Sequence, residues 1–203
     1  MATSPDNQFL VSGSFDNTVR VWQLSTGDLV KTMMHKEPIA AIALNHTGQI
    51  LASTGDDGLV KLWSLQTGEI IAQLTGNSNC ICSLAISPNS TTVVAGTVSG
   101  SIVLWSLDMA KIQNSDPLQK FKAHSGQINA CVFHPSGQYL ITGSVDGKAR
   151  IWSQDVGFNL LREKPRKTLR GEPGRSVMSA AVSADGKSIA IGGADGTIEL
   201  WQG

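Results

Sequence analysis

The stretch LITGSVDGKARIW, residues 140–152, contains the pattern that decides the fold. An apolar run leads into Val145-Asp146-Gly147, and an alternating run then ends at Trp152. Asp-Gly is a frequent hairpin turn because glycine adopts positive φ at little steric cost. Alternation with a period of two is typical of a strand that buries one face. The stretch therefore predicts two antiparallel strands joined by a tight turn.

Five tryptophans carry the same pattern on their N-terminal side. They are Trp22, Trp63, Trp105, Trp152 and Trp201, and 41 to 49 residues separate each from the next. The residues six positions before them are Asp16, Asp57, Ser99, Asp146 and Asp195. A pattern that recurs at this period indicates architecture and not a single site.

Each repeat contains the elements of four antiparallel strands. A turn and an apolar stretch, such as residues 39–44, precede the hairpin, and a Thr-Gly turn with another apolar run follows the tryptophan. Residues 39–44 do not alternate cleanly, which predicts a strand covered on both faces. One such sheet cannot bury its faces alone, so the sheets must stack radially. The expected units, together one domain, are 1–34, 35–75, 76–122, 123–170 and 171–203.

The sequence resembles the WD40-repeat proteins over essentially its whole length. The resemblance rests on the repeat period, the aspartate before the tryptophan, the upstream histidines, and turns such as SPDN (residues 4–7) and HPSG (residues 134–137). The family usually has an aspartate directly after the tryptophan, whereas this chain has Gln23, Ser64, Ser106, Ser153 and Gln202. The resemblance implies an all-β propeller with five four-stranded antiparallel blades, of which the first and last are incomplete.

The alignment of the repeats favours a larger propeller of which these blades are a part. Met1 aligns with Ile42, so the first inner strand starts partway along its length, and the last repeat stops two residues after Trp201. A closed five-bladed ring is the alternative. An assembly of several chains is the third interpretation, in which the incomplete blades associate with one another.

The resemblance also implies a buried tetrad in each well-formed blade, in which a His, a Ser or Thr, the Asp and the Trp are hydrogen-bonded. The complete tetrads are His35, Ser53, Asp57 and Trp63, and His124, Thr142, Asp146 and Trp152; the partial ones are Ser12, Asp16 and Trp22, and Asp195 and Trp201. The third repeat has Ala95 and Ser99 at two of these positions, and the fifth has Ile191 and Pro173. A catalytic serine needs an exposed hydroxyl beside an oxyanion hole. These hydroxyls lie within strands, so we expect structural roles, with His35 and Asp57 energetically coupled.

Composition and charge narrow the function classes. The chain has 203 residues, of which 41% are hydrophobic, and 16 Lys and Arg balance 16 Asp and Glu. A balanced charge gives no long-range attraction to nucleic acid or an anionic membrane. The apolar runs are too short to cross a bilayer, the three cysteines lack metal-binding spacing, and the N-terminus lacks the pattern of a secretory signal. We expect a cytoplasmic protein without a metal, a cofactor or membrane contact.

The expected function is that of a non-catalytic scaffold, which holds other proteins against loops on the propeller faces. In the family, the hairpins and the loops that enter the inner strands share one face. Residues on these loops follow no common type here, so they are free to specify a partner. The partner-binding candidates are Phe15, Lys36, Glu37, Asp56, Asn77, Val98, Val145 and Arg175.

A basic segment supplies the alternative function. Residues 162–175 hold six Lys and Arg against two Glu. Such a segment can bind nucleic acid or another polyanion through its phosphates. The other interpretation is a charged edge strand that prevents sheets from pairing edge to edge.

Overall fold

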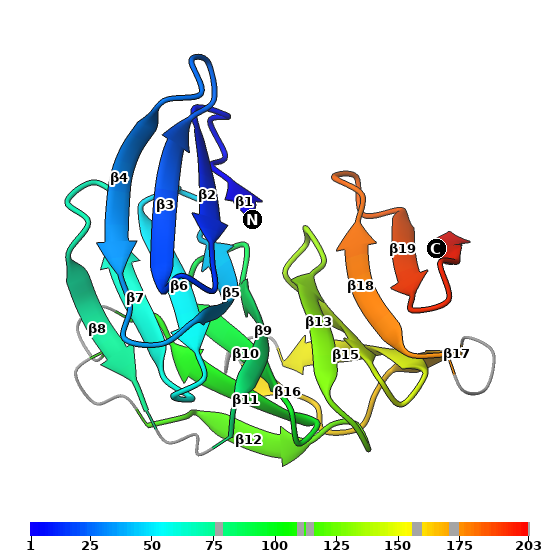
Figure 1. Ribbon diagram of the computed structural model, residues 1–203. Coiled ribbons are helices and arrows are strands. Elements are labelled where there is room, and N and C mark those ends of the chain that lie inside the picture. The colour runs from blue at the N-terminus through cyan, green and yellow to red at the C-terminus, as the bar shows by residue number, and fades with distance from the viewer. Residues whose placement is uncertain (76–78, 109–111, 113–115, 156–159, 171–174, 203) are drawn as a thin grey trace.

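The computed structural model describes residues 1–75, 79–108, 112, 116–155, 160–170 and 175–202 (Figure 1). These residues form five antiparallel sheets and contain no helix. The sheets follow one another along the chain around a common centre, and the first and last lie on opposite sides of an opening (Figure 1). The chain is thus an all-β propeller whose ring is not closed. Within the described ranges, no helix is long and apolar enough to cross a membrane.

The strands of each sheet are consecutive in the sequence. The first sheet contains β1 (Ala2–Thr3), β2 (Phe9–Gly13), β3 (Thr18–Gln23) and β4 (Leu29–Met34); the second contains β5 (Ile39–Leu44), β6 (Ile50–Gly55), β7 (Val60–Ser64) and β8 (Ile70–Leu74); the third contains β9 (Ile81–Ile86), β10 (Thr92–Thr97), β11 (Ser101–Ser106) and β12 (Gln119–Lys122). The fourth contains β13 (Ile128–Phe133), β14 (Tyr139–Ser144), β15 (Lys148–Asp155), β16 (Leu160–Leu161) and β17 (Lys167–Arg170), and the fifth contains β18 (Val177–Val182), β19 (Ser188–Gly193) and β20 (Ile198–Gln202).

The hairpins between the second and third strands have the conformation that the Asp-Gly pattern predicts. Gly58, Gly100, Gly147 and Gly196 all have positive φ, and Asn17 takes the same place in the first sheet with φ 67°. At Gly100 a side chain would also collide with the backbone carbonyls of His124 and Gly126. Glycine is required there for two reasons, the turn and the close approach of the next sheet.

The inner strands differ from the sequence prediction in one respect. In β5, β9, β13 and β18 the register shifts by one residue, which leaves a bulged residue unpaired; these residues are Ala40, Cys82, Asn129 and Met178. A bulge interrupts the alternation of a strand because two residues oppose one on the partner. The irregular pattern of residues 39–44 therefore has its origin in a bulge as well as in burial.

The sheets pack against one another through a repeated interface. In the second sheet, Val60 and Leu62 of β7 are fully buried and join a cluster with Trp105 of the third sheet. Three further clusters connect the other neighbouring sheets in the same way. Burial of each such aliphatic side chain stabilises the fold by about 1.5–3 kcal/mol. The corresponding residues of the fifth sheet, Ile198 and Leu200, are each 74% exposed.

The fourth sheet carries the basic segment. Strand β15 extends to Asp155, and its end pairs with the short strand β16. The outer strand β17 then pairs with residues 148–151 of β15. Residues 160–161, which directly precede the basic segment, therefore form a short fifth strand before the outer strand that we expect in each blade.

Candidate functional site

The fourth sheet contains the most complete buried network. The Trp152 indole N–H donates to Thr142 Oγ1 (2.8 Å), which also lies 2.7 Å from His124 Nε2. Both carboxylate oxygens of Asp146 lie 3.1 Å from His124 Nδ1. The four residues expected to form a tetrad are thus brought together, with Thr142 and His124 buried.

The second sheet forms a different network. Trp63 N–H donates to Ser53 Oγ (2.7 Å), and His35 Nε2 lies 2.7 Å from the same oxygen. Nδ1 of His35, however, accepts from the ammonium of Lys61 at 3.1 Å. Asp57 is exposed, and its carboxylate accepts from the backbone N–H of Leu59. The structure therefore does not bring Asp57 into hydrogen-bond contact with His35, because Lys61 takes its place.

A cation two residues before the tryptophan is the feature that sequence reasoning missed. Lys61 and Arg150 lie opposite Ser53 and Thr142 in the ladders, on the tetrad side of the sheet. Arg150 Nη1 lies 3.1 Å from Asp146 Oδ2 and 2.5 Å from His124 Nδ1. The signal was present in the sequence as Arg20, Lys61 and Arg150 at the same repeat position.

The first sheet has a shorter network on the same plan. Trp22 N–H donates to Ser12 Oγ at 2.9 Å. Asp16 accepts from the hydroxyl and N–H of Thr18 and forms an ion pair with Arg20 at 2.7 Å. Arg20 therefore stands where Lys61 and Arg150 stand in their sheets.

The third and fifth sheets lack the Ser or Thr hydroxyl that accepts the tryptophan N–H in the other sheets. Trp105 N–H donates to the backbone carbonyl of Thr75 at 2.9 Å. The N–H of Trp201 is buried without a hydrogen-bond partner, because Ile191 is apolar. Asp195 forms an ion pair with Arg175 at 2.8 Å. Pro173, which occupies the histidine position, lies outside the described residues.

Burial controls the protonation of both histidines. Burial lowers the pKa of His35 to about 4, and the neighbouring Lys61 charge acts in the same direction. Burial likewise lowers the pKa of His124 to about 4, against the attraction of Asp146. Burial opposes ionisation of Asp146, but His124 and the hydrogen bonds from Ser125 and Arg150 lower its pKa to about 2. Both imidazoles are therefore neutral at pH 7.

Burial keeps two of the three cysteines protonated. All three are free thiols. Burial raises the pKa of Cys82, and it raises the pKa of Cys131 to about 12, so these groups are protonated and weakly nucleophilic at neutral pH. In the part of the chain that the structure describes, no three His, Cys, Asp or Glu side chains are arranged to hold a metal ion.

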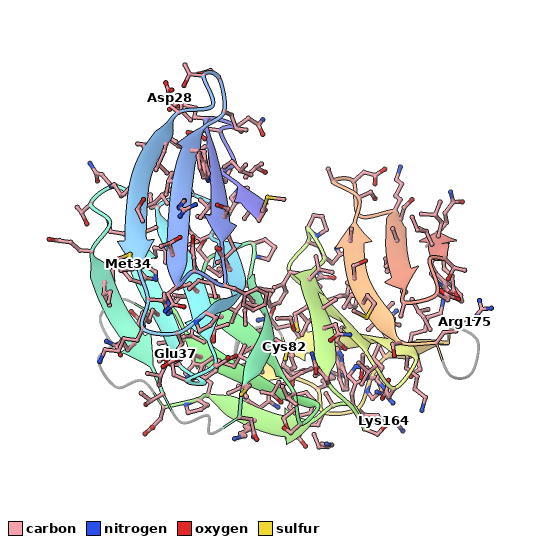
Figure 2. The ribbon with its side chains drawn as sticks, viewed as in Figure 1. Asp28, Met34, Glu37, Cys82, Lys164 and Arg175 are labelled. Carbon is pink, nitrogen blue, oxygen red and sulfur yellow. The ribbon has the colours of Figure 1, made fainter. Side chains whose placement is uncertain are left out.

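The hairpins and the loops that enter the inner strands are fastened together. The N–H groups of Val98, Val145 and Ala194 donate to the carbonyls of Cys80, Gln127 and Ser176 at 2.9–3.0 Å. In the first two sheets, Ile39 N–H donates to Ser14 O and Asn17 Nδ2 donates to Lys36 O. These bonds place the hairpins and entering loops at one end of the strands. Figure 2 shows Asp28, in the β3–β4 turn, and Glu37 at opposite ends of β4.

The partner-binding candidates differ in exposure on this loop face. Phe15, Val98 and Val145 are 83%, 47% and 42% exposed, although they are apolar. Lys36, Glu37 and Asp56 are also exposed. Arg175 is half-buried and engaged by Asp195. Asn77 lies outside the described residues.

The basic segment is not a free stripe of cations. Arg162 forms an ion pair with Asp155 at 2.8 Å, and Arg166 lies over the Tyr139 ring at 5.3 Å. Lys167 lies over the Trp201 ring at 5.9 Å. These three cations therefore have partners within the molecule, of which only Asp155 carries a compensating charge.

A hollow with a volume of about 510 Å³ lies between the first two sheets. Phe9, Val30, Lys31 and Gln49 contribute to its lining. The ammonium of Lys31 donates to the carbonyls of Leu65 (3.1 Å) and Gln66 (2.6 Å). This cation therefore fastens the sheets together.

Comparison with known proteins agrees with this architecture. The model of the WD domain, G-beta repeat, matches residues 1–23, 27–64, 68–106, 115–153 and 163–202. The chain is similar to mouse Telomerase protein component 1, with 25% identity over 98% of this chain and 7% of that protein. It is also similar to human Apoptotic protease-activating factor 1, with 30% identity over 52% of this chain and 9% of that protein. The chain spans less than a tenth of the length of either relative. Because the repeat model matches most of the residues in five successive copies, the chain belongs to the WD40-repeat family.

Proposed function

We propose that the protein is a non-catalytic scaffold that binds partner proteins through the loop face. The observation that carries the proposal is the exposure of Phe15, Val98 and Val145 at three hairpin tips. Backbone hydrogen bonds already hold these hairpins in place, so little conformational entropy is lost when a partner binds. Aromatic and aliphatic anchors surrounded by polar residues are typical of protein interfaces.

The buried networks support a structural role and not a catalytic one. Ser53 and Thr142 are 0% exposed, and each hydroxyl accepts a hydrogen bond from a tryptophan. A substrate cannot reach these oxygens, whereas a nucleophile must approach its substrate directly. We therefore propose no hydrolase activity for the His, Ser or Thr and Asp sets.

The experiment compares a triple and a double apolar-to-serine variant. The test protein carries Phe15→Ser, Val98→Ser and Val145→Ser on the loop face. The control carries Leu24→Ser and Leu118→Ser, which lie at the opposite ends of their sheets and have exposures of 43% and 47%, close to those of Val145 and Val98. Proteins that copurify with the tagged wild type are identified by mass spectrometry and then measured with both variants.

We expect the loop-face variant to lose its partners while the control retains them, with both melting near the wild-type temperature. The proposal is wrong if the loop-face variant keeps every partner and the control loses them.

A further inference from the structure

We propose a second binding site, which recognises a phosphorylated side chain of a partner protein, at the end of the fourth sheet opposite the loop face. The site is a hollow of about 240 Å³ lined by Gln138, Tyr139, Ser153, Gln154, Arg162 and Arg166. Every lining side chain carries a hydrogen-bond donor, and two carry a permanent positive charge. The site adds to the proposed scaffold function but does not depend on the loop face.

The backbone around the hollow is fixed by regular hydrogen bonds. Arg162 N–H donates to Ser153 O at 3.0 Å, and Arg166 N–H donates to Ile151 O at 2.8 Å. Gln154 N–H donates to Gln138 O at 2.8 Å, which holds the start of β14 against the end of β15. The backbones of both arginines are therefore anchored to β15 at residues two positions apart, and both residues line the same hollow.

Both arginines are exposed, and each side chain has one contact within the described part of the molecule. Arg166 lies over the ring of Tyr139, and the ring centroids of Tyr139 and His134 are 5.8 Å apart in an edge-to-face arrangement. His134 is itself held by Ser136 (2.8 Å) and by the carbonyl of Gly186 (3.0 Å). Arg162 uses its Nε to bind Asp155 at 2.8 Å, which leaves its terminal nitrogens available. Arginines held in this way lose less entropy on binding than free ones.

The donors of the hollow are uncommitted within the described chain. Within the described ranges, no side-chain hydrogen bond is formed by Gln138, Ser153, Gln154 or Arg166. Asp155 neutralises part of the charge of Arg162, but no carboxylate in the described ranges pairs with Arg166. The hollow therefore offers a cation and several neutral donors to one acceptor group.

The chemistry of these donors selects a phosphomonoester over other anions. A carboxylate has two oxygens and is satisfied by one arginine, whereas a phosphomonoester has three acceptor oxygens and a charge of about −1.5 to −2 at pH 7. Water occupies about 30 Å³ per molecule, so the hollow has room for roughly eight waters, enough for a phosphate group and the atoms that carry it. Nucleic acid requires a track of several free cations. Here Lys167 and Arg175 are engaged by Trp201 and Asp195.

The test titrates the intact, ¹⁵N-labelled protein with a short glycine peptide that carries one phosphoserine. The arginine Nε–Hε resonances are followed by NMR. The same peptide without phosphate and an oligothymidine are the other two ligands. We expect saturable shifts at Arg162 and Arg166 with the phosphopeptide and none with the unphosphorylated peptide.

Two substitutions separate this site from general charge attraction. Arg166→Ala should weaken phosphopeptide binding about ten-fold or more, because it removes charge-assisted hydrogen bonds. Lys164→Ala is the control, since Lys164 is an exposed cation of the same segment outside the lining (Figure 2), and its loss should change affinity less than about two-fold. Arg166→Lys retains the charge without the planar fork, and should also bind more weakly than the wild type.

Three results would overturn the proposal. They are the absence of saturable shifts, equal losses from Arg166→Ala and Lys164→Ala, and tighter binding of oligothymidine at the same resonances. The last result would identify nucleic acid as the ligand. None of them bears on partner binding at Phe15, Val98 and Val145, so failure here and failure of the proposed scaffold function are distinguishable.

Discussion

The ammonium of Lys61 lies 3.1 Å from Nδ1 of His35, whereas Nδ1 of His124 in the fourth sheet faces both the Asp146 carboxylate and Arg150 Nη1. An ammonium can only donate, so Nδ1 of the neutral His35 must be the acceptor. Its proton then sits on Nε2 and is donated to Ser53 Oγ, which also accepts from Trp63. A cation at Nδ1 without a carboxylate beside it thus sets the tautomer of the buried His35.

The first prediction concerns this tautomer. Long-range ¹H–¹⁵N correlation spectra at pH 7 should show His35 with a protonated Nε2 and an unprotonated Nδ1. In Lys61→Met the donor is absent, so the preference for this tautomer should weaken. Observation of a protonated Nδ1 in the wild type would contradict the Lys61 contact.

The second prediction concerns coupling within the networks. His35→Ala and Asp57→Ala should be additive in urea unfolding within about 0.5 kcal/mol, because the two side chains share no hydrogen bond. His124→Ala and Asp146→Ala should instead couple by about 1 kcal/mol or more, since each leaves the same buried contact unmade. The second cycle serves as the positive control for the first. Strong coupling of His35 with Asp57 would refute the arrangement in the second sheet.

The third prediction is a loss of stability as the pH falls from about 6.5 to about 4. The folded pKa values of His35 and His124 are about 4, below the ordinary value of 6.5, so the unfolded chain binds more protons within this window. Their contribution is present above the unfolded pKa and is lost as protonation proceeds, at up to about 1.4 kcal/mol per pH unit for each histidine. Asp146, with a pKa of about 2, acts only at lower pH.

Urea unfolding at a series of pH values measures this slope. His35→Gln removes one titrating group and should reduce the slope by about half. His46→Gln, at an exposed turn, is the matched control. A slope that is unchanged in His35→Gln would exclude His35 as its source.

The fourth prediction uses the buried N–H of Trp201, which has no partner. Thr142 accepts from Trp152 at the position that Ile191 occupies in the fifth sheet. Ile191→Thr should therefore be more stable than Ile191→Val by about 1 kcal/mol, because the two have nearly equal volume and only Thr supplies an acceptor. A buried hydroxyl without a partner would reverse this order in thermal or urea unfolding.

The fifth prediction concerns the uncovered face of the fifth sheet. Ile198→Ser with Leu200→Ser should reduce self-association in light scattering and leave the melting temperature nearly unchanged, since both residues are 74% exposed. Val60→Ser with Leu62→Ser changes the same repeat positions of the second sheet, where both are fully buried, and should cost about 3 kcal/mol or more. Equal losses of stability from the two pairs would show that the fifth sheet is covered in solution.

The architecture could be predicted because its determinants are local and repeated. Asp-Gly turns, alternating strands and the tryptophan interval each depend on neighbouring residues, and five copies reinforce one another. The hydrogen-bond networks around the tryptophans were harder to predict from the sequence. They depend on which long side chain of another strand contacts the histidine. Lys61 and Asp57 are four residues apart, and only the structure shows that Lys61 contacts Nδ1 of His35.

The proposed binding surfaces could likewise be predicted only in part from the sequence. Phe15 could be selected from the sequence because an aromatic residue at a hairpin tip is unusual, and it is exposed in the structure. Arg175 could not be judged, because its ion pair with Asp195 joins residues 20 positions apart. The hollow around Arg166 is lined by residues that are far apart in the sequence, from the start of β14, the end of β15 and the loop before β17. The composition of residues 162–175 therefore indicated a basic segment but not this hollow.

The four bulges of the inner strands each set one residue apart from the strand pairing. Each bulged residue leaves the ladder, and the buried tryptophan networks do not include Ala40, Cys82, Asn129 or Met178. The side chains at these positions are consequently independent of the tryptophan networks, and that of Asn129 instead joins two sheets by donating to Val177 O at 2.8 Å.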